Sequence, residues 1–300
     1  MSTISESRVA FGLVYGFQPF DADRMVAEAR EAETLGFDLF SVADHLHGEQ
    51  PTAEPWTALT WVAAVTERIS VLTNVLGLPY RSPAVTAKMA ETLDRLSGGR
   101  LILGLGTGGY DPEFTAFGLA QRSPGQKVTA LGEAVRIIRG LWAQPGFSFE
   151  GEEFRVRGAR IEPRPRRPIP VWLGTYGPRS LRLTGALADG WLPSLGRLDL
   201  GQAAAMRADV LAAAEAAGRD PGAITCAVNL MVDFRPDGPA ANAGGYRVGG
   251  RSQDIAEQLT AIVRAGFTVL NVVLADTDAR HRFAAEVMPL VRAELELRVQ

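Results

Sequence analysis

The sequence predicts an α/β fold, a (β/α)8 TIM barrel with an excursion after the fourth unit. Short apolar runs alternate with segments whose apolar residues recur at helical spacing along nearly the whole chain. This alternation is typical of a parallel sheet that is covered by helices. Eight such strand–helix units fit within the 300 residues of the chain, which suits one closed barrel. An open, doubly wound sheet is the alternative.

The first four units follow one another in order. Apolar runs predict strands at residues 9–14, 37–43, 70–78 and 100–106. Helical spacing predicts helices at residues 21–36, 54–69, 82–99 and 126–143. Gly36 marks the end of the first helix, and Pro55 stands where the first turn of the second helix accepts a proline.

The alternation is interrupted at residues 144–168, where we expect a hairpin around Gly151 and then a proline-rich connector. Further apolar runs predict strands at residues 169–174, 189–194, 223–234 and 267–275. The helices that follow them are predicted from residue 178 and at residues 200–217, 252–266 and 279–295. Because the excursion is too short to be a domain, we expect a single domain over residues 1–300.

Charge and cysteine content exclude several classes of protein. The net charge is −3 and the chain has no long basic run, so we expect no nucleic-acid partner. The lone Cys226 excludes an internal disulfide and a cysteine-based zinc site, which fits a reducing compartment. No apolar run approaches the roughly 20 residues of a membrane helix, and residues 1–12 lack the pattern of a signal peptide. We therefore expect a cytoplasmic protein with no membrane partner and no metal.

The stretch LFSVADHLHG, residues 39–48, ends a predicted strand in polar side chains. Barrel enzymes place their sites at the carboxyl ends of the strands, so we expect Asp44 and His45 at the barrel mouth. A histidine, whose unperturbed pKa is about 6.5, suits proton transfer. The alternative is a surface turn in which Asp44 caps a helix. His47 is expected to face solvent.

Three further strand ends carry unusual segments that would rise to the same rim: TNVLGLPYRSP, GLGTGGYDPEFTAFG and GTYGPRSL. The second matches G-x-G-x-x-G, but a dinucleotide fingerprint opens directly into a helix, whereas YDPEFTAFG has a proline and no helical period. We interpret its glycines as positions where the backbone lies close to a flat ligand. The third segment is a glycine-bearing turn into a helix, which is either a phosphate site or an ordinary loop.

Motifs spread over nearly the whole chain point to a known family. Besides the strand ends above, the most specific are VADH, ETLDRLSGGRLILGLGTGG, GEAVRIIRGLW, EPRPRRPIPVWLG and ADGWLP. Together, and in this order, they resemble the bacterial-luciferase-like flavin oxidoreductases, most closely the branch that uses the deazaflavin coenzyme F420. The resemblance implies a barrel with the cofactor ring at its mouth, hydride transfer to or from a small organic substrate, and a homodimer.

The resemblance also assigns roles to single residues. It implies that His45 donates or accepts a proton near the hydride-carrying carbon, and that a cis peptide bond joins Asn74 and Val75 behind the ring. The residues that it places around the cofactor are Asp44, Asn74, Val75, Gly77, Thr107, Gly108, Tyr176, Gly177, Arg179 and Ser180. The last four form the turn that would hold the side-chain phosphate. A pocket suited to a hydrophobic or planar substrate would be bordered by Tyr15, Phe17, Tyr80, Tyr110 and Phe114.

Departures from the family pattern narrow the expected function. Sugar-phosphate dehydrogenases of this branch carry a glutamate directly after the Thr-Gly pair, where this chain has Gly109. Asp111 and Glu113 lie nearby without being equivalent, so His45 is the main acid–base candidate. The chain lacks the long insertions of FMN monooxygenases, and it has Asp44 before the histidine where the luciferases show Glu-His-His. We therefore expect F420; an FMN-dependent monooxygenase and a non-catalytic flavin-binding barrel are the alternatives.

Overall fold

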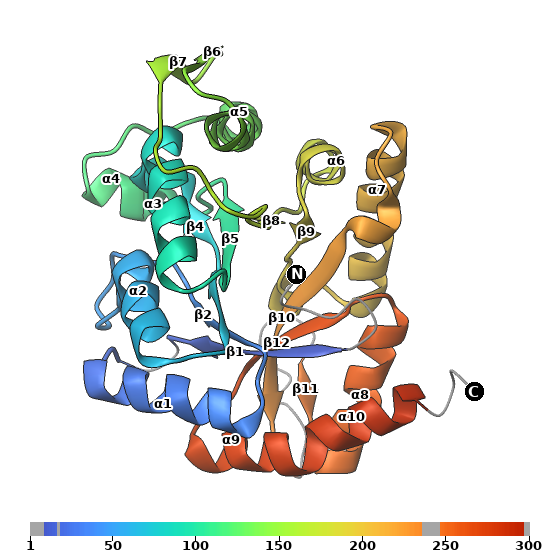
Figure 1. Cartoon of the computed structure of the whole chain (residues 1–300). Helices are drawn as coiled ribbons and strands as arrows, with labels where there is room; N and C mark the ends of the chain where they lie inside the picture. The colour runs from blue at the N-terminus through green and yellow to red at the C-terminus, as the bar shows by residue number, and fades with distance from the viewer. Residues whose placement is uncertain (1–8, 17–18, 236–246, 297–300) are drawn as a thin grey trace.

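The computed structural model describes residues 9–16, 19–235 and 247–296, which contain a closed barrel of eight parallel strands (Figure 1). The barrel strands are β1 (Ala10–Tyr15), β2 (Leu39–Val42), β3 (Ser70–Thr73), β5 (Leu101–Gly106), β8 (Val171–Gly174), β9 (Gly190–Trp191), β10 (Thr225–Asp233) and β12 (Val269–Val273). They pair in this order, and β12 pairs with β1 to close the ring. The predicted TIM barrel is confirmed, and the open sheet is excluded.

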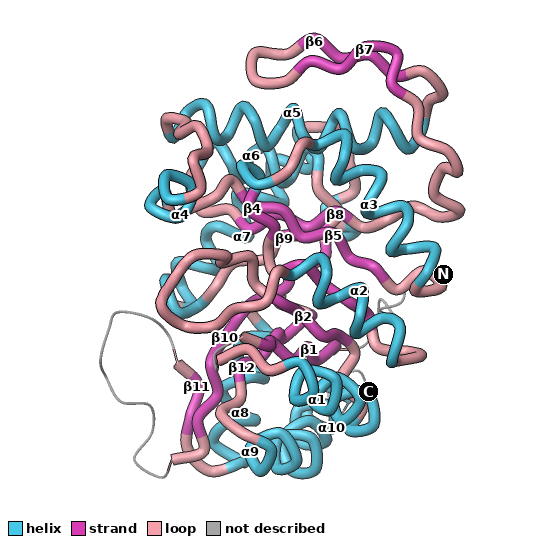
Figure 2. The backbone as a smooth tube through the Cα atoms, turned by 90° about the vertical axis from the view of Figure 1, so that its left-hand side faces the viewer, coloured by secondary structure: helices cyan, strands magenta, loops and turns pink. Residues whose placement is uncertain are grey.

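Helices cover the outside of the barrel, as Figure 2 also shows. The longer helices are α1 (Ala22–Leu35), α2 (Pro55–Val65), α3 (Pro83–Leu96), α5 (Pro124–Ala143), α6 (Pro178–Leu187), α7 (Leu200–Ala216), α8 (Ser252–Arg264) and α10 (Met288–Glu296). As predicted, Gly36 ends α1, where its φ of 85° favours glycine. Proline begins α2, α3, α5 and α6, because the first turn of a helix does not need its N–H group.

Shorter elements lie in the connections between these helices and strands. They are β4 (Leu76–Gly77), β11 (Val248–Gly249), α4 (Asp111–Ala116), α9 (Thr277–Arg282), the 3-10 turns η1 (Leu78–Tyr80), η2 (Leu195–Arg197) and η3 (Pro221–Ala223), and the π-helical turn η4 (Phe283–Val287). Helix α4 corrects the prediction that YDPEFTAFG is not helical. A helix of six residues is too short to show an apolar period, and Pro112 fits its first turn.

The excursion after α5 is the antiparallel hairpin of β6 (Phe147–Glu150) and β7 (Arg155–Ala159), and the proline-rich connector follows it. Glu133 of α5 fixes this hairpin. Its buried carboxylate accepts hydrogen bonds of 2.7–3.0 Å from the N–H groups of Glu152, Glu153 and Phe154. The predicted hairpin around Gly151 is thus confirmed.

The inside of the barrel is built in two layers. The lower layer has one apolar residue from each strand or strand end: Ala10, Leu39, Leu72, Ile102, Trp172, Leu192, Ala227 and Val269. Side chains of a strand return to the same face at every second residue. Two positions further along stand Gly12, Ser41, Asn74, Gly104, Gly174, Ser194, Asn229 and Asn271. This upper layer of small and polar residues forms the floor of the barrel mouth.

Candidate active site

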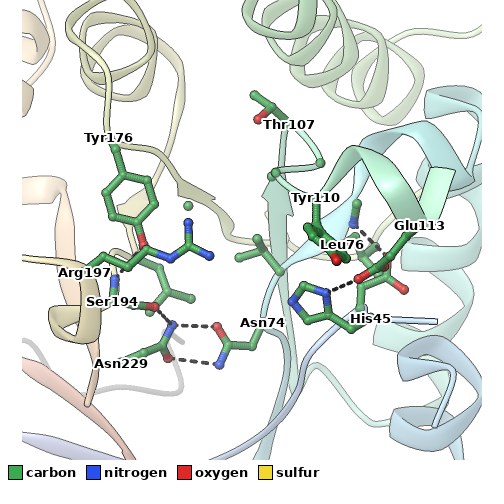
Figure 3. A pocket seen from close by; sticks show the side chains of 18 of the residues that line it. His45, Asn74, Leu76, Thr107, Tyr110, Glu113, Tyr176, Ser194, Arg197 and Asn229 are labelled. Carbon is green, nitrogen blue, oxygen red and sulfur yellow. Dashed lines mark hydrogen bonds and ion pairs between the residues drawn. The ribbon is translucent and has the colours of Figure 1, made fainter. Parts of the chain in front are cut away.

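A pocket of about 240 Å³ opens above the upper layer, at the carboxyl ends of the strands (Figure 3). The four strand ends that stood out in the sequence all contribute to its lining. They supply, among others, His45 after β2, Gly77 after β3, Thr107 after β5 and Tyr176 after β8. The prediction that these segments meet at one rim is confirmed.

His45 faces this pocket with one side of its ring held in place. Its Nδ1 lies 2.7 Å from Oε1 of Glu113, and the Glu113 side chain is 4% exposed while that of His45 is 61% exposed. The second carboxylate oxygen of Glu113 accepts a 2.7 Å hydrogen bond from the Tyr80 hydroxyl. Because Nδ1 is engaged, Nε2 is the ring nitrogen that is free for chemistry in the pocket (Figure 3).

Tyr80 and its neighbour Phe114 stabilise the position of Glu113. Burial and the Glu113 carboxylate raise the pKa of Tyr80 far above its ordinary value, so the hydroxyl stays protonated and donates. The Phe114 ring packs against the Tyr80 ring at a centroid distance of 4.8 Å. Glu113 therefore has a fixed partner on each side of its carboxylate, His45 and Tyr80.

Glu113 is the site residue whose importance the sequence analysis missed. Gly109 stands where relatives have a glutamate, and Glu113 was considered nearby but not equivalent, yet α4 brings Glu113 back to His45 across 68 residues of sequence. The other nearby acid, Asp111, pairs with Lys127 at 2.5 Å. The Asp-Pro pair at the start of α4 is a helix-start pattern, and it was the available sign that this segment is helical.

Asp44 supports the pocket wall through a carboxylate whose two oxygens are both hydrogen-bonded. It is buried and accepts hydrogen bonds from the Gly77 N–H (2.7 Å) and from the Arg81 guanidinium (2.7 and 3.2 Å). Burial raises the pKa of Asp44, and Arg81 with the Gly77 N–H opposes that shift by stabilising the charge. The alternative of a surface turn is wrong, because Glu54 and not Asp44 caps the helix that follows.

The peptide bond between Asn74 and Val75 is cis, as predicted. The Val75 side chain lies over glycines, since a Cβ atom placed on Gly104, Gly106 or Gly174 would come within 3.1 Å of it. These glycines therefore make room for Val75. Gly106 and Gly109 of the GLGTGG segment also line the pocket, and their close approach to a flat ligand stays a prediction. Val75, Gly106 and Gly174 together form one wall of the pocket.

Thr107 and Gly108 line the pocket beside this wall. Gly108 has a φ of 79°, and a Cβ atom there would lie 2.6 Å from the Phe114 ring. Its carbonyl accepts a 2.9 Å hydrogen bond from Lys127. Glycine is thus required here, because both the backbone conformation and the packing of α4 exclude a side chain.

The turn GTYGPRSL leads into α6 as predicted, and its first part reaches the pocket. Tyr176 lines the pocket, and its hydroxyl accepts a 2.9 Å hydrogen bond from the Ser194 N–H. Gly177 precedes α6, Arg179 donates to the backbone at the start of α5, and the Ser180 hydroxyl donates to the Gly177 carbonyl. Gly177, Arg179 and Ser180 therefore lie next to Tyr176 but outside the pocket lining.

The aromatic border of the pocket is confirmed in part. Tyr110 and Phe114 line the pocket. Tyr80 stands behind this border, and Tyr15 is buried in the core. Phe17 lies outside the described residues.

Comparison with known proteins agrees with this geometry. A family model described as luciferase-like monooxygenase matches residues 3–244. The chain belongs to the luciferase-like monooxygenase family. A curated relative in Kineococcus radiotolerans, an F420-dependent glucose-6-phosphate dehydrogenase, is 33% identical over 73% of this luciferase-like chain and 66% of its own length. An F420-dependent hydroxymycolic acid dehydrogenase of Mycobacterium tuberculosis is 34% identical over 77% of this chain and 65% of its own length. The chain thus spans about two thirds of the length of these relatives.

Solved structures show the same fold as this luciferase-like chain. An F420-dependent secondary alcohol dehydrogenase in complex with an F420–acetone adduct has a TM-score of 0.85 at 19% identity and covers 95% of this chain and 99% of its own. A long-chain alkane monooxygenase has a TM-score of 0.80 at 14% identity, and the match covers 97% of this chain and 92% of the monooxygenase. At these identities the likeness concerns the fold alone.

The pocket of this luciferase-like chain has an apolar wall, a polar floor and polar side chains opposite His45. Val75 and the backbone at Gly77 form one face, and the polar layer lies below. Tyr176 and Arg197 stand on the side opposite His45 (Figure 3). In the described ranges, no group of three His, Cys, Asp or Glu residues could hold a metal ion. Nor does any helix of those ranges have the length and apolar character of a membrane span.

Proposed function

We propose that this luciferase-like protein is an oxidoreductase that uses coenzyme F420 in hydride transfer to or from a small organic substrate. The observation that carries the proposal is His45 at the barrel mouth, with one ring nitrogen held by Glu113 and the other free in the pocket. Two F420-dependent dehydrogenases among the curated relatives support the choice of cofactor. When bound, the deazaflavin would supply the hydride chemistry.

The residues of the chain would then hold the ring and move a proton. The proposed wall for the ring consists of Asp44, Asn74, Val75, Gly77, Thr107 and Gly108. His45 would donate or accept the proton at Nε2. Glu113 would keep the imidazole in one orientation and stabilise its charged form, since a carboxylate next to an imidazolium lowers the free energy of that charge.

The turn before α6 is the proposed place for the cofactor's phosphate, held by Tyr176, Gly177, Arg179 and Ser180. The first turn of a helix offers free N–H groups and a positive end. We expect Gly177→Asp to weaken F420 binding about tenfold or more, because the new carboxylate opposes the phosphate. The loss would be measured by fluorescence titration of F420.

Gly177→Ala is the matched control for this prediction. The nearest atom to a Cβ at that position is the Ser180 hydroxyl at 3.8 Å, so a methyl group fits without strain. We expect this variant to keep the affinity of the wild type. Equal affinity of the aspartate variant would remove the turn from the site.

The cofactor that copurifies with the protein tests the proposed function. In a host that makes both cofactors, we expect F420, which absorption and the mass of its polyglutamate tail distinguish from FMN. Copurified FMN would contradict the proposal and favour a monooxygenase of the same family. Bound F420 without turnover of any alcohol, aldehyde, enone or imine would favour a non-catalytic flavin-binding barrel.

We also propose that one domain of 300 residues forms a homodimer in the cytoplasm. Trp61 of α2 and Val85 and Leu96 of α3 are 58%, 54% and 71% exposed, and we propose that they belong to the dimer contact. The lone Cys226 is buried as a free thiol, which fits a reducing compartment. Sedimentation tests the contact: we expect a wild-type dimer that Trp61→Glu weakens, and a wild-type monomer would contradict it.

A further inference from the structure

The polar layer under the pocket joins side chains of several strands in one hydrogen-bonded group. Asn74, after β3, and Asn229, in β10, exchange two amide hydrogen bonds of 3.0 and 2.9 Å. Asn271 of β12 donates to Oδ1 of Asn229 at 2.7 Å and to Ser41 of β2 at 2.9 Å. The Nδ2 of Asn229 also donates to Ser194, after β9, at 3.4 Å. Asn229 is thus the member with contacts to three of the other four. Figure 3 shows two of these contacts, to Asn74 and to Ser194.

Both N–H donors of the Asn74 amide are engaged in this group. Its oxygen accepts from Asn229, and its nitrogen donates to Asn229 and, at 3.4 Å, to Ser41. A primary amide has two N–H donors, and both of these are in use. Although Asn74 lines the pocket, its side chain has no donor left for a ligand. The bonds of both N–H donors to the polar layer therefore anchor the backbone of residue 74.

We propose that Asn229 is a positioning residue, which holds Asn74 and thereby keeps residues 74–77 in the shape that binds the cofactor ring. Two reciprocal hydrogen bonds allow one orientation of the Asn74 amide, because each oxygen must meet the other nitrogen. Residues 74–77 carry the Val75 side chain and the Gly77 N–H that donates to Asp44. The inference rests on the proposed function, in which the ring lies against these residues.

A variant of Asn271 distinguishes a positioning role of Asn229 from a general contribution of the polar layer to stability. Asn271 is fully buried and has the same side-chain amide. It donates to Asn229 and Ser41 and makes no hydrogen bond to Asn74. Its removal therefore damages the layer but leaves the pair of Asn74 and Asn229. If the layer served stability alone, losing either asparagine would affect cofactor binding alike.

Asn229→Asp is the most informative variant, because it keeps the shape of the side chain and creates a reversible defect. The ionised aspartate has no N–H for Oδ1 of Asn74, so one of the two bonds becomes a contact between two acceptors. The protonated aspartate donates its O–H to that oxygen and restores the pair. The contact between two acceptors disfavours the ionised form and raises the pKa of this partly buried carboxyl above its usual value of about 3.9, which brings the restoration into an accessible pH range.

The test is a fluorescence titration of F420 with the wild type, Asn229→Asp and Asn271→Ala at about pH 5 and about pH 8. We expect Asn229→Asp to bind about five- to tenfold more weakly at the higher pH, the effect of about one lost hydrogen bond, and to approach the wild type at the lower pH. Asn271→Ala should melt at a lower temperature but bind F420 within about twofold of the wild type at both pH values.

Three results of this titration would overturn the inference. They are an unchanged affinity of Asn229→Asp at the higher pH, a loss that does not depend on pH, and an equal loss in Asn271→Ala. If the wild type binds no F420, the proposed function fails. The same titrations with FMN then decide the positioning role by the same criteria.

A second measurement needs no cofactor. The Tm values of Asn74→Ala, Asn229→Ala and the double variant report whether the two amides act as a pair. For a coupled pair, the double variant loses less than the sum of the two single losses. Additive losses would overturn the pairing on which the inference depends.

Discussion

Replacement of His45 by alanine is expected to lower the turnover number by about 10²–10⁴-fold, the usual contribution of general acid–base catalysis. The carboxylates of Asp44 and Glu113 lie close to His45. Asp44 is hydrogen-bonded to Arg81 and to the Gly77 N–H, so it cannot replace the imidazole. Glu113 lies behind the ring and is nearly buried. The affinity for F420 should change far less, because the wall that holds the ring does not depend on the imidazole. Steady-state kinetics with a turned-over substrate, beside cofactor titration, would measure both effects.

His47→Ala is the matched control, since it removes the same side chain two residues further along the chain. His47 is exposed and packs edge-on against Phe117, with ring centroids 6.0 Å apart. We expect its turnover to stay within about twofold of the wild type, as for most surface substitutions. Near-normal turnover of His45→Ala, or an equal loss in His47→Ala, would assign the proton to another group.

Glu113→Gln is expected to lower the turnover number by about 10- to 1,000-fold, less than the loss of the histidine itself. Glutamine is nearly the same size, and its amide oxygen still accepts from Nδ1 of His45. It has no charge, however, so it no longer stabilises the imidazolium that forms during proton transfer. KM for the substrate should change little, because Glu113 lies behind the histidine. Kinetics with separate kcat and KM values would show this division.

Two further variants show whether this effect belongs to the pair of His45 and Glu113. Asp111 lies in the same helix as Glu113, but its carboxylate pairs with Lys127. Asp111→Asn should therefore leave kcat near the wild-type value. Tyr80→Phe removes the donor to the second oxygen of Glu113 and should cost a fewfold loss of kcat. If Asp111→Asn lowered kcat as much as Glu113→Gln, the carboxylates of α4 would contribute to the structure of this loop and not to proton transfer by His45.

Most of the fold could be predicted because the barrel is encoded in local patterns. In β2, Leu39 points into the barrel and Phe40 packs outward under the helices, so both faces are apolar, as in any strand that is buried on two sides. The polar layer follows the same rule. Asn229 and Asn271 interrupt two apolar strands, each two positions after an inward apolar residue, so their common level in the barrel could be counted from the sequence.

The pairing of side chains in the site could not be predicted in the same way. His45 meets Glu113 across 68 residues, and this contact depends on the short helix α4. Asp44 finds Arg81 only when the ends of β2 and β3 lie side by side. A sequence indicates which segments reach the rim, because each follows a strand. The choice of partners is set by loop geometry, which no local period describes.

In the proposed function, the pocket above the polar layer binds F420, with His45 at its edge. An equilibrium titration of the wild type with F420 and with FMN, under the same conditions, tests it most directly. We predict that F420 binds at least about tenfold more tightly, a difference of about 1.4 kcal/mol in binding free energy. Tighter binding of FMN, or binding of neither cofactor, would contradict the claim.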